Sequence, residues 1–362
     1  MAVHIPLSKK AQEEAITLMM PQNNLLKPAD GSPITLPNKE MALGVYYLTT
    51  VDETLRKEHL IAFATANEAF LAYDLRKMSV REPAMVRLSN GQTIETTIGR
   101  LMFNESLIKG MEYINEPVKA SGIKRIITAA LEKYTSIEVA GLIDSIKTLG
   151  FFGATISGVS VSVFDNEMVK GKESMIRDAE KKVTKIEEDY QKGLITLDER
   201  KRLANDVWLA TTDQMAEMTW NNLKETNITR FIINSEGARA GKEQLKQLSA
   251  MRGLILDPLG KIVELPIKSN FREGLSIFEY VASARGSRKG LTDSALKTAN
   301  AGYLTRRLVD VSHDVLIMAE DCETTTGVVI KNSPERTATI AGPRSPPASR
   351  PDAGSRGAGS RR

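Results

Sequence analysis

The sequence predicts a mixed α+β fold that is predominantly helical, and three stretches lead to that prediction. Residues 270–316 contain no proline and combine good helix formers with an apolar series, which favours one long helix. Residues 168–225 carry apolar side chains at alternating spacings of three and four on both sides of Gly193, which is typical of an antiparallel helical hairpin. Residues 85–97 alternate in polarity around Asn90-Gly91, which indicates a β-hairpin.

The composition sets loose bounds. With 362 residues, of which 41% are hydrophobic, the chain is long enough to bury a core and to form two or three domains. The net charge is +4, and its positive excess lies in the last 32 residues. Nucleic-acid binding must therefore be argued from the positions of the charged residues and not from the net charge. Cys322 is the single cysteine, which excludes an internal disulfide and fits a reducing cytoplasm.

No segment predicts export or a membrane span. The first residues lack the apolar core of a signal peptide. The run 148–164 has no charge, but Gly150, Gly153 and Gly158 interrupt it, so we expect buried packing there.

The N-terminal third predicts short helices separated by turns. Ser8 is a plausible N-cap for an amphipathic helix that reaches about residue 20. Asp30-Gly31 predicts a turn in a proline-rich loop. Thr65 and Glu68 form a capping-box pattern at the start of a helix that runs to about Lys77.

Two further capping boxes define helices in the middle of the chain. Thr135 with Glu138 opens a helix that we expect to end at Gly150. Thr196 with Glu199 opens the second arm of the hairpin. The two arms offer matching apolar seams, namely Ile176, Ala179, Val183, Ile186 and Tyr190 on the first and Leu203, Val207 and Ala210 on the second.

The long stretch at 270–316 predicts a rod of roughly 65 to 70 Å if it forms one helix. Four glycines at 274, 286, 290 and 302 mark places where the rod can bend or lie close to another molecule. Between residues 285 and 307 six Lys or Arg face a single acid, Asp293. Such a local excess of positive charge suits a polyphosphate backbone, whereas a solvated basic helix is the alternative interpretation.

Residues 284–311, ARGSRKGLTDSALKTANAGYLTRRLVDV, closely resemble the bridge helix of the bacterial RNA polymerase beta-prime subunit family. In that family the bridge helix crosses the cleft beside the catalytic centre, and the resemblance places it here at about 271–316. It implies that Thr298 and Ala299 face the template base. It also makes active-site neighbours of Arg288, Lys289, Lys297, Tyr303 and Arg306.

The charged residues of this helix have two interpretations. Lys297 and Arg306 lie nine residues apart, or two and a half turns, so we expect separate phosphate contacts and not one clamp. The alternative for Arg306 and Arg307 is pairing with Asp310 and Asp314 at helical spacing.

The start of the chain resembles the family segment that follows the loop whose three aspartates hold catalytic magnesium. The resemblance therefore implies that no catalytic residue lies in this chain, that the Mg²⁺ loop belongs before Met1, and that Met1 is internal to a longer protein. His4, His59 and His313 show no ligand spacing, so packed or surface histidines are expected.

Two further segments resemble parts of the family around the nucleotide entry path. The hairpin at 168–225 corresponds to the funnel rim, where secondary-channel regulators dock. The segment from Gly237 to Phe271 corresponds to the stretch before the bridge helix, and Arg239 matches the arginine that reaches the incoming nucleotide's phosphates. A guanidinium suits that role because its fork binds two oxygens at once, although an arginine in a glycine-rich turn is more often a surface residue. Ala240 and Gly241 depart from the family pattern of glycine and serine, and Ile233 stands where many members carry methionine.

The C-terminal part departs from the family. Cys322 matches the first of four cysteines that bind structural Zn²⁺, and because one thiol cannot form a tetrahedral site, no bound zinc is expected. Residues 331–362 are rich in Pro, Ser, Gly, Ala and Arg and predict a disordered tail.

The resemblance implies five regions: the end of the catalytic-loop domain at 1–20, a pore or funnel-entry domain at 21–165, a funnel domain at 166–255, the start of the cleft domain at 256–330, and the tail. It implies a part of a cytoplasmic DNA-directed RNA polymerase that is inactive alone. Implied partners are the remaining beta-prime segments, the beta and alpha subunits, sigma factor, template DNA and RNA. The competing hypotheses are a truncated or stand-alone non-enzymatic nucleic-acid-binding module, and a regulator that mimics the polymerase rim.

Overall fold

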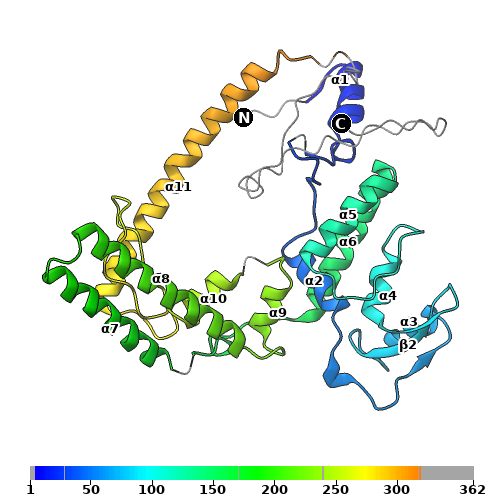
Figure 1. Ribbon diagram of the computed structural model, residues 1–362. Coiled ribbons are helices and arrows are strands. Elements are labelled where there is room, and N and C mark those ends of the chain that lie inside the picture. Colours follow the sequence, from blue (N-terminus) through cyan, green and yellow to red (C-terminus); the bar gives the residue numbers. More distant parts are fainter. Residues whose placement is uncertain (1–4, 28, 170, 239, 317, 319–362) are drawn as a thin grey trace, which may run out of the picture. The chain divides into compact units, whose positions relative to one another are not determined.

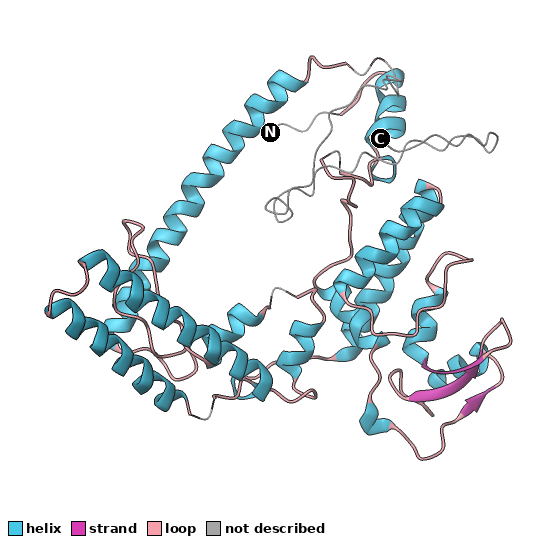
Figure 2. Ribbon diagram, in the orientation of Figure 1, coloured by secondary structure: helices cyan, strands magenta, loops and turns pink. Residues whose placement is uncertain are grey.

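The computed structural model describes residues 5–27, 29–169, 171–238, 240–316 and 318 (Figure 1). Over these residues the chain is predominantly helical with one small sheet, which confirms the predicted α+β class (Figure 2). The fold divides into two units. Unit 1 comprises the described residues of Met1–Ser160 and Ile232–Arg239, and unit 2 comprises those of Val161–Phe231 and Ala240–Lys331. The predicted tail at 331–362 lies outside the described residues.

Unit 1 begins with the capped helix that the sequence predicts. The hydroxyl of Ser8 accepts a hydrogen bond from the backbone nitrogen of Ala11 at 3.2 Å, and α1 (Lys9–Glu14) follows. The helix continues as a π-helical segment (Ala15–Met19) and a 3-10 turn (Pro21–Asn23). Gly31 has a φ of 65°, which confirms the turn at Asp30-Gly31 because glycine adopts this region without strain.

The helices α2 (Glu40–Thr49) and α6 (Ser136–Ser157) form the closest pair in unit 1. The capping box of Thr135 and Glu138 opens α6 as predicted. The predicted end at Gly150 is wrong, because α6 continues to Gly158, which closes it with a φ of 54°. Gly150 serves instead as a contact surface: a Cβ there would lie 2.5 Å from the carbonyl oxygen of Met41 in α2.

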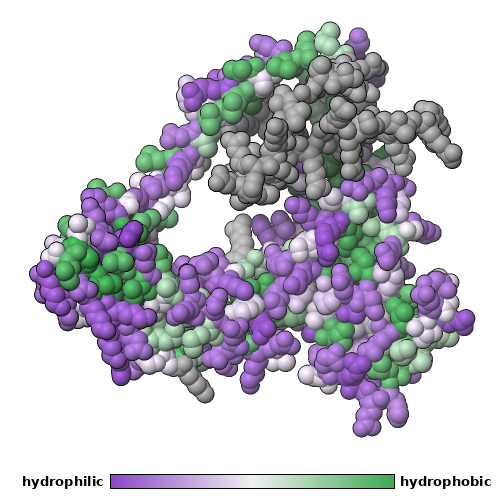
Figure 3. Space-filling view, in the orientation of Figure 1, coloured by the Kyte–Doolittle hydropathy of each residue, from purple (hydrophilic) through white to green (hydrophobic). Residues whose placement is uncertain are grey.

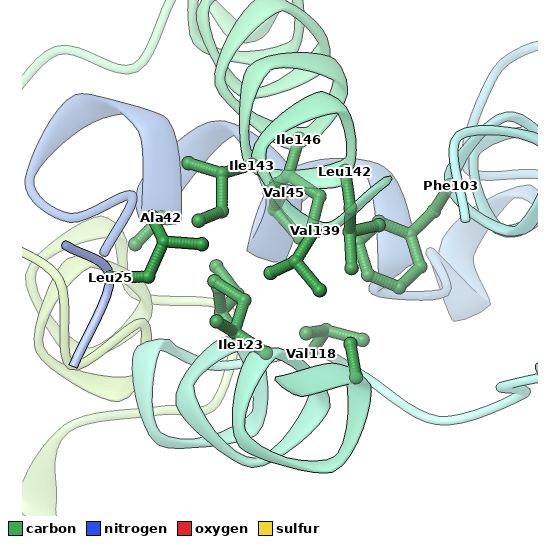
Figure 4. Packing of buried hydrophobic residues seen from close by; sticks show 12 residues of the cluster. Leu25, Ala42, Val45, Phe103, Val118, Ile123, Val139, Leu142, Ile143 and Ile146 are labelled. Carbon is green, nitrogen blue, oxygen red and sulfur yellow. The ribbon is translucent and has the colours of Figure 1, made fainter. Parts of the chain in front are cut away.

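The core of unit 1 lies between α2, α5 (Ala120–Lys133) and α6, and α4 (Ile98–Glu105) adds a large aromatic side chain to it. Figure 4 shows these side chains turned toward one another. The cluster consists of Leu25, Ala42, Val45, Phe103, Val118, Ile123, Ile127, Ala130, Val139, Leu142, Ile143 and Ile146. Burial of these apolar surfaces provides the main driving force for the packing of the helices.

A three-stranded sheet lies beside this core, in the order β1-β2-β3. Strands β2 (Pro83–Arg87) and β3 (Thr93–Thr97) are antiparallel, with Met85 opposite Glu95, and Gly91 turns the chain at a φ of 82°. The predicted hairpin is therefore confirmed. The short β1 (Ala62–Phe63) pairs in parallel with β2, and it was not predicted because its partner is distant in sequence.

Two elements complete this part of unit 1. A 3-10 turn (Glu53–Leu55) precedes β1, and α3 (Ala66–Asp74) packs near the sheet. The backbone nitrogen of Glu68 donates to the hydroxyl of Thr65 at 3.3 Å, which confirms the predicted N-cap of α3.

Unit 2 contains the predicted helical hairpin, formed by α7 (Lys172–Gln191) and α8 (Leu197–Asn222), which lie side by side (Figure 1). Gly193 turns the chain at a φ of 74°, and Thr196 caps α8. One predicted seam residue is wrong: Ala210 is exposed. The larger Trp208 and Met215 occupy the buried face instead, against Ala179 of α7.

Four more elements complete the described part of unit 2 and its boundary with unit 1. A 3-10 turn (Val163–Asp165) precedes the hairpin, α9 (Ile228–Asn234) spans the division between the units, and α10 (Lys242–Ser249) packs on α8. An irregular segment then leads to α11 (Ile277–Ser312).

Among the described residues, α6 is the one helix long and apolar enough to cross a membrane, and a core helix passes the same test. The buried packing predicted for residues 148–164 is wrong for most of that run. Gly150 and Gly153 are buried, but Phe151 and Phe164 are 48% and 79% exposed. The glycines bury one narrow face, and the aromatic side chains between them point away from it.

Candidate nucleic-acid interface

The long helix α11 is continuous over 36 residues, which corresponds to a length of about 54 Å. Gly286, Gly290 and Gly302 lie inside it without interrupting it. The predicted start at 270 or 271 is wrong, because Gly274 has a φ of 88° and the helix begins after Ser276. The side chain of Asn270 is tied to the carbonyl oxygens of Ser249 and Ala250, which holds this segment outside the helix.

A capping box at the start of α11 also holds the preceding segment. The carboxylate of Glu279 accepts hydrogen bonds from the backbone nitrogens of Ser276 (3.0 Å), Lys268 (2.9 Å) and Ser269 (3.2 Å), and from the hydroxyl of Ser269 (2.8 Å). Burial raises the pKa of this carboxyl, but the hydrogen bonds from Ser276 and Ser269 together outweigh burial and lower the pKa to about 2. The S-x-x-E spacing of this pair was visible in the sequence and was overlooked.

The site residues predicted for the long helix all lie on α11. Lys289 is half-buried, and Arg288, Lys297, Thr298, Ala299, Tyr303 and Arg306 are exposed. Arg288 and Arg306 are 18 residues apart, or five turns, so they share one face of the helix. Ala299 lies between them on that face, because 11 and 7 residues are close to whole numbers of turns. Lys297 lies nine residues before Arg306, on the opposite face of the helix.

The charges on α11 differ in their partners. Arg306 pairs loosely with Asp310 at 3.9 Å, and both side chains are largely exposed. Arg307 lies over the ring of Tyr303 at 4.5 Å from its centroid. Within the described residues no carboxylate oxygen lies within 4 Å of Arg288, Lys289 or Lys297, so these cations are open to an external anion.

The apolar side chains of α11 are exposed on all sides of the helix, and green and purple residues intermix along it in Figure 3. Phe278, Leu291 and Leu296 are examples, whereas Ser283 is the buried residue of the described helix. Apolar side chains that are exposed on every side of a helix indicate surfaces that other molecules can cover. Thr298 satisfies its hydroxyl by donating to the carbonyl oxygen of Ser294 at 2.7 Å.

The residues just before Arg239 are anchored within unit 1, while Arg239 itself lies outside the described residues. The backbone nitrogen of Lys39 donates to the carbonyl oxygen of Gly237 at 3.0 Å. Glu236 and Lys39 both have positive φ values, 58° and 55°, which is uncommon for residues with a side chain and marks a strained segment. A Cβ at Gly237 would lie 2.3 Å from that of Ala42, so only glycine fits there.

The described residues do not fit the metals that the resemblance implies. No three His, Cys, Asp or Glu side chains among them gather closely enough to hold a metal ion. His59 and His313 are exposed, and His4 and Cys322 lie outside the described residues. No chemical step in this chain is therefore assigned to Mg²⁺ or Zn²⁺.

Two family models match the chain. The model described as RNA polymerase Rpb1, domain 3, matches residues 24–166, and that described as RNA polymerase Rpb1, domain 5, matches residues 274–338. Both descriptions name RNA polymerase Rpb1, so the matches indicate that the chain belongs to the RNA polymerase class of proteins.

Curated relatives narrow the class. The chain is 42% identical to a DNA-directed RNA polymerase subunit beta' of Desulforamulus reducens over 94% of its own length and 28% of the relative. It is 40% identical to one of Acidothermus cellulolyticus over 91% of the chain and 27% of the relative, and 41% identical to one of Moorella thermoacetica over 94% and 29%. The chain belongs to the bacterial RNA polymerase beta' family, and it spans less than a third of the length of these relatives.

Proposed function

We propose that this chain forms the bridge helix and part of the secondary-channel wall of a DNA-directed RNA polymerase, which transfers nucleotides from ribonucleoside triphosphates to the RNA 3′ end. The observation that carries the proposal is the form of α11: a continuous rod of 36 residues with Thr298 and Ala299 exposed just past its middle. Small side chains at these positions allow a templating base to approach the helix closely. The beta' membership supports the same role.

The cations of α11 would hold the nucleic-acid backbone on either side of that base. Arg288 and Arg306 share the face that carries Ala299, at a separation of about 27 Å along the helix. Each guanidinium can bind a phosphate through two parallel hydrogen bonds. Lys297 would contact a different strand or segment, because it lies on the opposite face, while Lys289 and Tyr303 flank the arginines.

The segment at 235–238 supports a nucleotide-side role for Arg239. Its strained backbone is anchored to α2 by the hydrogen bond to Gly237, and Ser235 accepts from the backbone nitrogen of Ala120 at 3.1 Å. A rigid support of this kind is what a residue that positions a phosphate requires. In the proposed enzyme two Mg²⁺ ions would activate the RNA hydroxyl and neutralise phosphate charge, and residues outside this chain would hold them.

The proposed assembly contains the remaining beta' segments, the beta and alpha subunits, sigma factor, DNA and RNA, in the cytoplasm. Within it, residues 1–20 end the catalytic-loop domain, 21–165 form the pore domain, 166–255 the funnel domain, and 256–330 begin the cleft domain. The α7/α8 hairpin, with Leu194 71% exposed at its turn, would receive secondary-channel regulators. Its mixed charged surface and apolar tip suit a protein partner.

Binding of an RNA–DNA hybrid to the 362-residue chain tests this proposal. Fluorescence anisotropy over a range of salt concentrations gives the affinity and its salt slope. Replacing Arg288 and Arg306 with Gln should weaken binding and reduce the magnitude of the slope of log K against log salt by about 2, since two phosphate contacts are lost.

The matched control replaces Arg177 and Arg202 with Gln, because both arginines are exposed cations on the α7/α8 hairpin and the net charge changes equally. The control should bind like the unmodified chain. Equal weakening by both pairs would mean that net charge and not α11 controls binding, and the proposed role of α11 would be rejected.

A further inference from the structure

The segment between α10 and α11, residues 252–276, forms an irregular connection that we term the strap. It is folded back on itself: Gly253 pairs with Ile267 and Leu256 with Ile262 through isolated bridges. Ile267 is 1% exposed, so the strap has its own fixed point in the core of unit 2. The strap therefore has a defined conformation.

The strap is attached to the α7/α8 hairpin by ion pairs. The ammonium of Lys268 lies 2.6 Å from a carboxylate oxygen of Glu180 on α7, and 5.7 Å from the centre of the Trp208 ring on α8. A second attachment is at Glu264, which lies 2.9 Å from Arg200 and 3.1 Å from Lys201, both on α8. Both arms of the hairpin thus contact the strap.

The same strap is attached to the first turns of α11. The backbone nitrogen of Lys268 donates to Glu279 at 2.9 Å. Asp257 pairs with Arg285 at 2.9 Å, and Arg252 donates to the hydroxyl of Ser283, the buried residue of α11. These contacts cover the first three turns of the helix and leave the rest of α11 without strap contacts of this kind among the described residues.

We infer that Lys268 couples the α7/α8 hairpin to the N-terminal end of α11, so that an event that loosens one also loosens the other. Its ammonium holds α7, while its backbone nitrogen holds the carboxylate that caps α11. The coupling free energy between two elements is the same in both directions. A change that destabilises the start of α11 must therefore also destabilise α7. A partner that binds the hairpin would act on α11 through this residue. The inference requires no binding of nucleic acid, so it stands or falls separately from the proposed function.

Hydrogen exchange measured by mass spectrometry on the 362-residue chain tests the coupling. Glu180→Gln and Lys268→Met each remove the ion pair and keep the backbone hydrogen bond to Glu279. Each should raise the exchange rate of the amides at residues 280–285 about two- to fivefold, the range that an exposed ion pair supports. The double variant should exceed neither single variant, and the charge-swapped Glu180→Lys, Lys268→Glu chain should recover protection.

The matched control is Asp178→Asn, which breaks an exposed ion pair with Lys181 at 3.2 Å on the same helix. It should leave exchange in α11 unchanged. Equal effects of Asp178→Asn and Glu180→Gln, or no effect of Glu180→Gln, would overturn the inference.

A reciprocal measurement separates coupling from simple local stability. Ser276→Ala removes the cap of α11. As a single substitution it should raise the amide exchange rates at residues 176–183 of α7. In the Lys268→Met background this remote effect should disappear. If it persists unchanged, the coupling runs through other contacts and its assignment to Lys268 is wrong.

Discussion

Gly44 of α2 and Gly150 of α6 touch through their backbones. A Cβ built on Gly44 would lie 1.8 Å from the carbonyl oxygen of Gly150, and one on Gly153 would lie 2.5 Å from the carbonyl oxygen of Gly44. No side chain fits between the helices at this crossing. The core of unit 1 therefore depends on glycine at these three positions for its closest packing.

Replacing Gly44 with Ala should destabilise unit 1 by about 2 to 3 kcal/mol, because both backbones must move apart to admit one methyl group. Urea unfolding followed by the fluorescence of tyrosines in unit 1 measures the change. Gly141→Ala is the matched control, since no atom lies within 4 Å of the Cβ that it adds on an exposed turn of α6. The control should be neutral or stabilising by up to about 1 kcal/mol, because alanine favours a helix. Equal losses from both variants would contradict the close-packing explanation.

Arg100→Met should destabilise the same unit by about 2 to 3 kcal/mol, because it leaves the carbonyl oxygen of the buried residue Thr49 without this donor. Arg100 is 8% exposed, and its guanidinium donates to the carbonyl oxygen of Thr49 at 2.8 Å and to the side chain of Asn115 at 3.1 Å. Burial lowers the pKa of this guanidinium. The control Arg87→Met removes an exposed arginine on β2 and should change the unfolding free energy by less than about 0.5 kcal/mol.

Local signals in the sequence predicted local structure well. The N-caps at Ser8, Thr135 and Thr196, and the turn at Gly91, need only residues within four positions of one another, and all four are present. The end of α6 was predicted wrongly because it depends on a contact with a part of the chain that is distant in sequence. Gly150 is a common helix terminator, and its true role is fixed by α2, which lies about a hundred residues earlier.

The candidate site was only partly accessible to sequence reasoning. The α11 residues share one helix, so their order alone gives their faces, and the faces of Arg288, Ala299 and Arg306 follow. Lys268 gave no signal, because its ion pair with Glu180 joins positions 88 residues apart. Arg239 and Cys322 stay predictions from the resemblance.

Glu279→Gln should weaken the start of α11 by about 1 kcal/mol at pH 7, since an amide is a poorer acceptor for the four donors around it. The pKa of Glu279 is lowered to about 2 in the folded chain, so its contribution is complete above the ordinary pKa of 4.5 and is lost as pH falls from 4.5 to 2. Amide exchange at residues 280–285 should therefore lose protection over that pH window in the unmodified chain. If the Glu279→Gln variant loses protection at residues 280–285 over the same pH window, a group other than Glu279 is responsible.

The isolated 362-residue chain should not extend an RNA primer on a DNA template in the presence of Mg²⁺ and ribonucleoside triphosphates. The proposed role assigns to it positioning residues of α11 and no metal ligand among the described residues. Extension of a radiolabelled primer is the measurement, with a complete bacterial RNA polymerase as the positive control. Template-dependent product from the chain alone would refute the assignment.

The single buried residue of the described α11, Ser283, lies near one end of the helix, and Ser312 lies about 44 Å further along it. A rotation of α11 about Ser283 would therefore move the distant end of the helix most. A tilt of about 5° at Ser283 would displace the far end by about 4 Å, which is close to the spacing of stacked bases along a duplex. If the proposed coupling holds, small displacements at Lys268 and Glu279 would grow with distance along α11, so these two residues would help to set the position of its cationic side chains.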